Sequence, residues 1–221
     1  MPLGEVTQAL FEGSVPWRVF RWYRGQAHFS GSYWSATMQA PVGYESRLEL
    51  ANLLLADFDP RVSRIQSQPF LLEGDDSDRH RKHIPDYLLG YTDGSTCVVD
   101  VKPAARLTAP KVRESLDWSR RVVEEHGWEY RVECEPNPVL LANVRFLAGY
   151  RRHFQFVPAE VDAAASRLGA PITLNGAIAC ARAVVADAGL ARSLVLHLLW
   201  RQRVRTDMTV PLDSLSVLEA R

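Results

Sequence analysis

Two acidic residues and a lysine lie close together within residues 84–103. Asp86 follows a proline, and Asp100 and Lys102 are two residues apart in an otherwise apolar run. Side chains on a β-strand alternate between its faces, so Asp100 and Lys102 are expected to point the same way. A carboxylate and an ammonium are costly to bury unless they are paired or bind a ligand. The pattern predicts a hydrolytic site built around a hard cation.

Such a site suits the hydrolysis of phosphodiesters, which needs an activated water and neutralisation of charge on the phosphate. Mg²⁺ takes oxygen ligands from one or two carboxylates and keeps several waters; Mn²⁺ is expected to substitute. The expected ligands are Asp86, Asp100 and the main-chain carbonyl of Val101, and Lys102 is expected to orient or deprotonate the attacking water or to bind the phosphate. A further acid from a packed helix would complete the site, with Glu49 and Glu45 as the two candidates.

The alternative for these residues is structural. Asp100 and Lys102 would then form an ion pair at a strand edge while Asp86 caps a turn, and isolated Asp-x-Lys tripeptides are common. Three coinciding features favour the catalytic interpretation: a strand that starts with Pro-Asp, a turn of suitable length, and an acid-bearing helix upstream.

The elements that position the site follow from periodicity and turn signals. Two strands, 84–89 and 97–103, are expected to be joined by a turn at Asp93-Gly94. Around them the sequence predicts a helix over 44–57, a strand over 62–72, an acidic loop over 73–78, a helix over 110–125, a strand over 128–134 and a helix over 137–150. This order indicates an α/β fold in which helices flank a central sheet.

Three parts of the chain are expected. Residues 1–43 form an aromatic- and arginine-rich arm that includes Trp17, Trp22 and Arg24; it is expected to pack on the core or, alternatively, to contact nucleic acid by stacking. Residues 44–157 form the core domain. Residues 158–221 are expected to form three helices and a small β-ribbon, which is the winged-helix order.

The composition is that of an ordinary globular protein. Of 221 residues, 47% are hydrophobic and 24% charged, and the net charge is zero. Basic residues cluster at 79–83, 145–153 and 201–205, and each cluster is more typical of a solvated surface than of a phosphate track. Without a membrane-spanning apolar run or a secretory signal, we expect a cytoplasmic protein that does not bind membranes.

Other chemistries are not favoured. The three cysteines are far apart and are expected to be reduced. The histidines lack zinc-ligand spacing, and His80 and His83 are assigned to a basic loop. No glycine-rich phosphate loop is present, so no nucleotide cofactor is expected.

Five runs of the sequence are specific enough to compare with known families. They are Ser46-Arg47-Leu48-Glu49-Leu50, Phe58-Asp59-Pro60, Gln66-Ser67-Gln68-Pro69-Phe70, Pro85-Asp86-Tyr87-Leu88 and Val99-Asp100-Val101-Lys102-Pro103-Ala104-Ala105. Over about residues 17–155 the chain resembles the TnsA-like transposon endonucleases of the PD-(D/E)XK superfamily. The resemblance implies a restriction-endonuclease-like core with a mixed sheet and a magnesium-dependent nuclease that cuts the 5′ ends of a transposon. It also implies DNA, a DDE transposase of the TnsB type and an AAA+ regulator as partners.

The resemblance also implies roles for individual residues. The helix glutamate of the family falls on Glu49, its first strand acid on Asp86 and its catalytic lysine on Lys102, which leaves Glu45 as an acid at the surface or behind the metal ligands. The position two before the lysine is glutamine in the best-known TnsA and Asp100 here, which restores the full acid-x-lysine pattern. Gln68 lies in a shared motif and is expected to pack, to hydrogen-bond a site residue or to contact phosphate.

Two other functions stay open at this point. One is a stand-alone restriction, repair or defence nuclease of the same fold. The other is a catalytically idle DNA-binding assembly protein that uses the winged helix, which in the family contacts partner proteins.

Overall fold

The computed structural model describes residue 5 and residues 29–77, 79–152 and 156–221. Trp17, Trp22 and Arg24 of the predicted arm lie outside these residues. The chain divides into two compact units, Met1–Pro136 and Asn137–Arg221. The division falls before the helix that the sequence groups with the core domain. Each unit is described by itself.

A four-stranded mixed sheet is the centre of the first unit. Its strands, in spatial order, are β3 (Val62–Ser67), β6 (Tyr87–Tyr91), β7 (Thr96–Val101) and β8 (Glu129–Glu133). The first three are antiparallel, and β8 runs parallel to β7. All residues of β6 and β7 are buried, as expected for strands covered on both faces. The predicted α/β core with a central mixed sheet is therefore confirmed.

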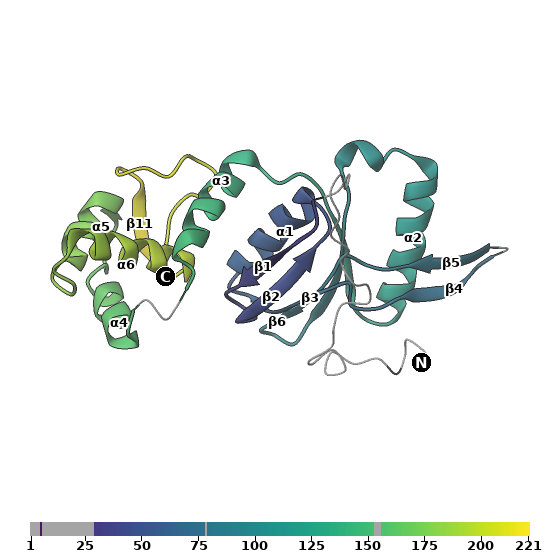
Figure 1. The fold of residues 1–221 in the computed structure, drawn as a ribbon, viewed down its shortest axis with the longest axis horizontal. Helices are drawn as coiled ribbons and strands as arrows, with labels where there is room; N and C mark the ends of the chain where they lie inside the picture. Colours follow the sequence, from purple (N-terminus) through teal and green to yellow (C-terminus); the bar gives the residue numbers. More distant parts are fainter. Residues whose placement is uncertain (1–4, 6–28, 78, 153–155) are drawn as a thin grey trace. The chain divides into compact units, whose positions relative to one another are not determined.

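Helices α1 (Arg47–Phe58) and α2 (Pro110–Glu125) cover opposite faces of this sheet (Figure 1). Ser46 caps the start of α1: its hydroxyl accepts a hydrogen bond from the Glu49 N–H (3.1 Å), and the Glu49 carboxylate accepts one from the N–H of Glu45, the residue before the cap (2.7 Å). Pro110 occupies the first turn of α2. On the α2 side the core contains Leu72, Leu88, Val98, Leu116, Trp118, Val123 and Tyr130.

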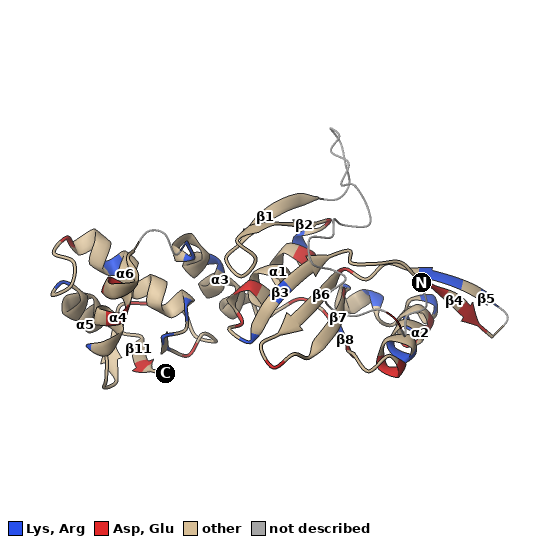
Figure 2. Ribbon diagram, turned by 90° about the horizontal axis from the view of Figure 1, so that it is seen from below, with Lys and Arg blue, Asp and Glu red and all other residues tan. Residues whose placement is uncertain are grey.

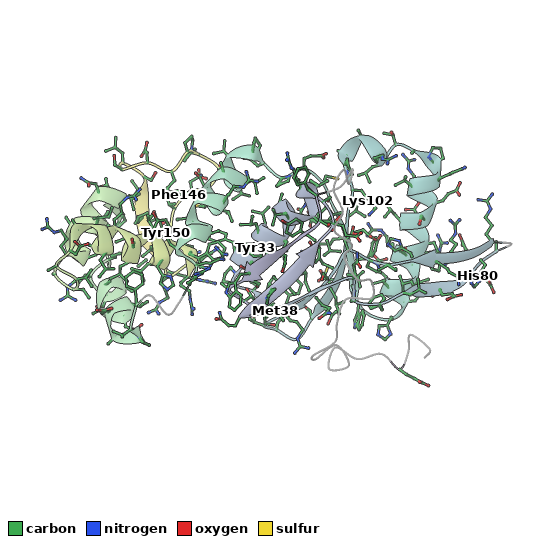
Figure 3. The ribbon with its side chains drawn as sticks, viewed as in Figure 1. Tyr33, Met38, His80, Lys102, Phe146 and Tyr150 are labelled. Atoms are coloured by element: carbon green, nitrogen blue, oxygen red, sulfur yellow. The ribbon has the colours of Figure 1, made fainter. Side chains whose placement is uncertain are left out.

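The hairpin of β1 (Gly31–Ser35) and β2 (Ala40–Tyr44) is tied to α1 by one buried acid, Asp57. Its carboxylate accepts hydrogen bonds from the Tyr33 hydroxyl (2.7 Å), the Ser35 hydroxyl (2.6 Å) and the backbone N–H groups of Ala36 (2.9 Å) and Thr37 (2.8 Å). Tyr33 is labelled in Figure 3. These bonds fix the hairpin against the end of α1.

A second hairpin corrects the sequence prediction. β4 (Leu72–Asp76) and β5 (Arg79–His83) pair antiparallel and extend beyond the edge of the sheet, with acids on β4 and bases on β5 (Figure 2). The predicted acidic loop and the basic loop holding His80 and His83 are therefore wrong. Cross-strand pairs of opposite charge, such as Lys82 with Glu73 at 2.7 Å, stabilise these strands without the apolar alternation that sequence reading relies on.

The predicted strand over 62–72 is interrupted at Gln68. This residue has a φ of 44°, in the left-handed region, so the extended strand stops at Ser67. The chain resumes pairing only at Leu72, as part of the second hairpin.

The second unit is mostly helical. Its helices are α3 (Pro138–Leu147), η4 (Ala148–Tyr150), α4 (Pro158–Ser166), α5 (Leu174–Ala181) and α6 (Ala188–Trp200). Three short strands, β9 (Ile172–Thr173), β10 (Val204–Arg205) and β11 (Val217–Ala220), pair antiparallel in the order β10-β11-β9. Every residue from Leu194 to Trp200 is buried, so α6 forms the centre of this unit. No helix within the described ranges is long and apolar enough to span a membrane.

Candidate active site

The acid and lysine residues meet where β6 begins and β7 ends. Tyr87 pairs with Val99, so the antiparallel register brings Asp86 next to Asp100. The Asp86 carboxylate accepts hydrogen bonds from the Val101 N–H (2.7 Å) and from Lys102 Nζ (3.1 Å). Lys102 Nζ also lies 3.8 Å from Asp100 Oδ1. Asp100 and Lys102 therefore point to the same side of β7, as the alternation predicts.

Three oxygen atoms surround the Lys102 ammonium, whose side chain is labelled in Figure 3. They are Asp86 Oδ2 (3.1 Å), the Val101 carbonyl (3.2 Å) and Asp100 Oδ1 (3.8 Å), which are the oxygens expected to hold a cation. Burial by itself lowers the pKa of Lys102, but the charges of Asp86 and Asp100 outweigh burial and hold this pKa above its ordinary value. In the absence of a metal ion, the contacts with Asp86 and Asp100 therefore favour the charged form of Lys102.

Glu49, in the first turn of α1, lines the same cavity as Asp86 and Lys102. Burial, followed by the charge of Asp86, raises the pKa of Glu49 to about 7. Burial also raises the pKa of Asp86, against the opposing effect of Lys102. Burial is the larger cause for both carboxyl groups, and a bound cation would lower the pKa of each by favouring its ionised form.

Two residues that the sequence analysis did not assign to the site hydrogen-bond the Asp100 carboxylate. His83 Nε2 lies 2.8 Å from both carboxylate oxygens, and the Tyr130 hydroxyl donates to Oδ2. Burial and the charge of Asp100 raise the pKa of Tyr130 well above its ordinary value, so its hydroxyl stays a donor. Asp100 itself is 0% exposed. The network fixes a buried carboxylate whose partners come from β5 and β8.

Signals for these two residues existed in the sequence. The alternation of Trp128, Tyr130 and Val132 places Tyr130 on the face that carries Asp100 once β8 is known to run parallel beside β7. His83 was missed because its strand was assigned to a loop. It is the last residue of β5, directly before the segment that carries Asp86.

The two remaining candidates lie next to the site. Glu45 lines the cavity and contacts Glu49 through its backbone N–H. Gln68 donates its backbone N–H to the Asp86 carbonyl (2.9 Å), so its strained backbone helps to place Asp86. Its buried side-chain oxygen has no hydrogen-bond partner among the described residues.

The site opens into a cavity with a volume of about 720 Å³. Glu45, Glu49, His83, Asp86 and Lys102 line one side of it, and Arg106, Lys111, Val112 and Ser115 line the part contributed by the chain before and within α2. Acidic and basic groups therefore line the same cavity.

The oxygen donors of the site suit a hard cation such as Mg²⁺. Within the described residues, however, no three His, Cys, Asp or Glu side chains are gathered as a ready metal cluster. The contacts explain this: Lys102 Nζ lies among the oxygens of Asp86, Val101 and Asp100, and His83 and Tyr130 engage the Asp100 carboxylate. The oxygens of Asp86, Val101 and Asp100 would hold a metal ion in exchange for their contacts with Lys102, so the donor set fits a cation that competes with this ammonium.

The segment that carries this site matches a known family. Residues 59–135 match the family described as TnsA-like endonuclease N terminal, a range that contains Asp86, Asp100 and Lys102. The resemblance inferred from the sequence motifs is thereby confirmed. No curated protein matches the chain.

Proposed function

We propose that this chain, whose residues 59–135 match the TnsA-like endonucleases, is the DNA-cleaving subunit of a heteromeric transposase. It hydrolyses phosphodiesters at the 5′ ends of the transposon with Mg²⁺, which Mn²⁺ can replace. Its partners are transposon-end DNA, a DDE transposase subunit of the TnsB type and an AAA+ regulator. The observation that carries the proposal is the set of three oxygens, from Asp86, Val101 and Asp100, around the Lys102 ammonium.

The chemistry divides between a metal and the residues of this chain. Asp86, Asp100 and the Val101 carbonyl would hold the ion, with Glu49 beside them, and the ion supplies an activated water and neutralises phosphate charge. Lys102 binds a phosphate oxygen, or orients or helps to deprotonate the attacking water. His83 and Tyr130 keep Asp100 in one orientation, and the Val101 N–H does the same for Asp86.

The second unit is proposed to be a winged-helix-like module that contacts partner proteins. The element order α4-β9-α5-α6-β10-β11 and the sheet order β10-β11-β9 support this proposal. A helical unit with a small antiparallel sheet can dock a protein or DNA, and the family resemblance favours a protein.

The test is a cleavage assay on transposon-end DNA with Mg²⁺, with and without the co-encoded transposase. Asp86→Asn and Lys102→Ala should each abolish cleavage, while Asp117→Asn, an exposed acid on α2 outside the cavity, should leave it unchanged. Full activity of Asp86→Asn would overturn the assignment. Equal cleavage without the transposase would favour a stand-alone nuclease, and assembly without any cleavage would favour an idle binding protein.

A further inference from the structure

Two basic side chains in the cavity have no part in the chemistry described above. Arg106 ends the short helix η3 (Ala104–Arg106), and Lys111 lies in the first turn of α2. Both side chains are exposed, and both line the cavity that contains Asp86 and Lys102. Within the part of the chain that the structure describes, neither side chain has a hydrogen-bond, ion-pair or ring partner. Their charges are therefore available to a ligand.

The basic residues of the β4–β5 hairpin differ in this respect. Arg81 pairs with Asp76 (2.5 Å), Lys82 with Glu73 (2.7 Å) and Arg79 with Glu114 (3.4 Å). Each positive charge on that hairpin is already balanced by a nearby acid. The hairpin is the more conspicuous basic cluster in the sequence, but it offers less uncompensated charge to a polyanion than the cavity does.

The backbone holds Arg106 and Lys111 in place although their side chains are free. The Arg106 N–H donates to the Pro103 carbonyl (2.8 Å), and its carbonyl accepts from the Ala109 N–H (3.2 Å). The residue after each cation, Leu107 and Val112 respectively, packs against the hydrophobic core. Because the backbone is already fixed, binding a ligand would have to order only the side chains.

The charges of the cavity require such cations if the substrate is DNA. Glu45, Glu49 and Asp86 all line the cavity and would repel a phosphate, and only part of that repulsion is offset by Lys102. We infer that Arg106 and Lys111 bind the backbone phosphates next to the scissile one and hold the cut strand in the cavity. This inference rests on the proposed function, because it takes the substrate to be DNA.

The test measures how DNA affinity depends on salt, by fluorescence anisotropy with a labelled transposon-end duplex in buffer without Mg²⁺. Each lost phosphate contact lowers the slope of log affinity against log salt by about 0.9, so Arg106→Ala/Lys111→Ala should lower it by about 1.8. Arg106→Lys/Lys111→Arg should restore the slope. The control is Arg113→Ala, because Arg113 is exposed on the same helix but does not line the cavity, and it should keep the wild-type slope.

The outcomes separate this inference from the proposed function. If the wild type cuts DNA and Asp86→Asn does not, but the double alanine variant keeps the wild-type slope, the phosphate contacts are refuted and the nuclease stands. The phosphate contacts are equally refuted if Arg113→Ala lowers the slope as much as the double variant. If the wild type neither binds nor cuts transposon-end DNA with its transposase present, both ideas are overturned.

Discussion

Replacing Tyr130 with phenylalanine removes one hydroxyl from the network around Asp100 and nothing else. The ring stays buried in the core, and Arg120 keeps its position over it, 5.1 Å from the centroid. What is lost is a hydrogen bond to a buried carboxylate, which contributes roughly 1.5–3 kcal/mol. At about 2 kcal/mol, a chain of this length should unfold at a temperature lower by roughly 4–8 °C.

The same variant should also cleave DNA more slowly. Asp100 keeps its contact with His83 but loses one of the two donors that fix its orientation. Losses of this kind next to a metal ligand typically lower metal affinity or activity by about 10- to 100-fold. The decrease should appear in the cleavage assay with Mg²⁺ even at temperatures where the variant is fully folded.

The matched control is Tyr87→Phe, which removes the hydroxyl of another buried tyrosine. Among the residues that the structure describes, the Tyr87 hydroxyl hydrogen-bonds only a neutral carbonyl, that of Gly43, at 3.4 Å, so its loss should cost less than about 1 kcal/mol. Thermal unfolding followed by circular dichroism compares the two variants. If Tyr130→Phe is no less stable than Tyr87→Phe and cuts DNA at the wild-type rate, the hydroxyl does not support Asp100 and the reasoning fails.

Two further predictions concern α1. Asp57→Ala removes the carboxylate that accepts from four donors of the β1–β2 hairpin and should lower the free energy of unfolding by about 3–5 kcal/mol in urea titrations, whereas an exposed Asp117→Ala should change it by less than about 0.5 kcal/mol. Glu49 has a pKa raised from 4.5 to about 7, so ionising it disfavours the folded state and stability falls as pH rises from about 4.5 to 7. Glu49→Gln should remove this loss: in chelator, its advantage over the wild type should grow across that interval to about 3 kcal/mol and stay constant above it. If the stability difference between Glu49→Gln and the wild type does not change with pH, the pKa of Glu49 is not raised in the folded state.

The β6–β7 hairpin of the candidate site could be predicted from the sequence because its signals are local. The Asp93-Gly94 turn and two short apolar runs fix the pairing, and alternation then places Asp100 and Lys102 on one face. Helix α2 could be predicted equally well, because Pro110 marks its start and an amphipathic pattern marks its buried side. In these segments the local conformational preference of the residues and the packing in the folded protein favour the same secondary structure.

The β4–β5 hairpin could not be predicted in the same way. Its strands carry charge on nearly every residue, and their stability comes from pairs such as Arg81 with Asp76 that no single-strand pattern reveals. The error also hid His83, since its role depends on where the end of β5 lies relative to Asp100. Contacts between segments distant in sequence, such as Tyr130 with Asp100, likewise need the sheet order, which periodicity does not supply.

The register between β6 and β7 determines which residues face each other in the candidate site. Residues 92–95 lie at the far end of both strands, in a place where surface loops usually accept insertions. If one added residue shifted the register of β7 by one position, a valine in place of Asp100 would lie opposite Asp86. Asp100 and Lys102 would then point toward the face of the sheet that α1 covers. We therefore expect a shift of β7 by one position to abolish cleavage while most of the core still folds, and an insertion that the turn absorbs as extra loop to leave cleavage intact.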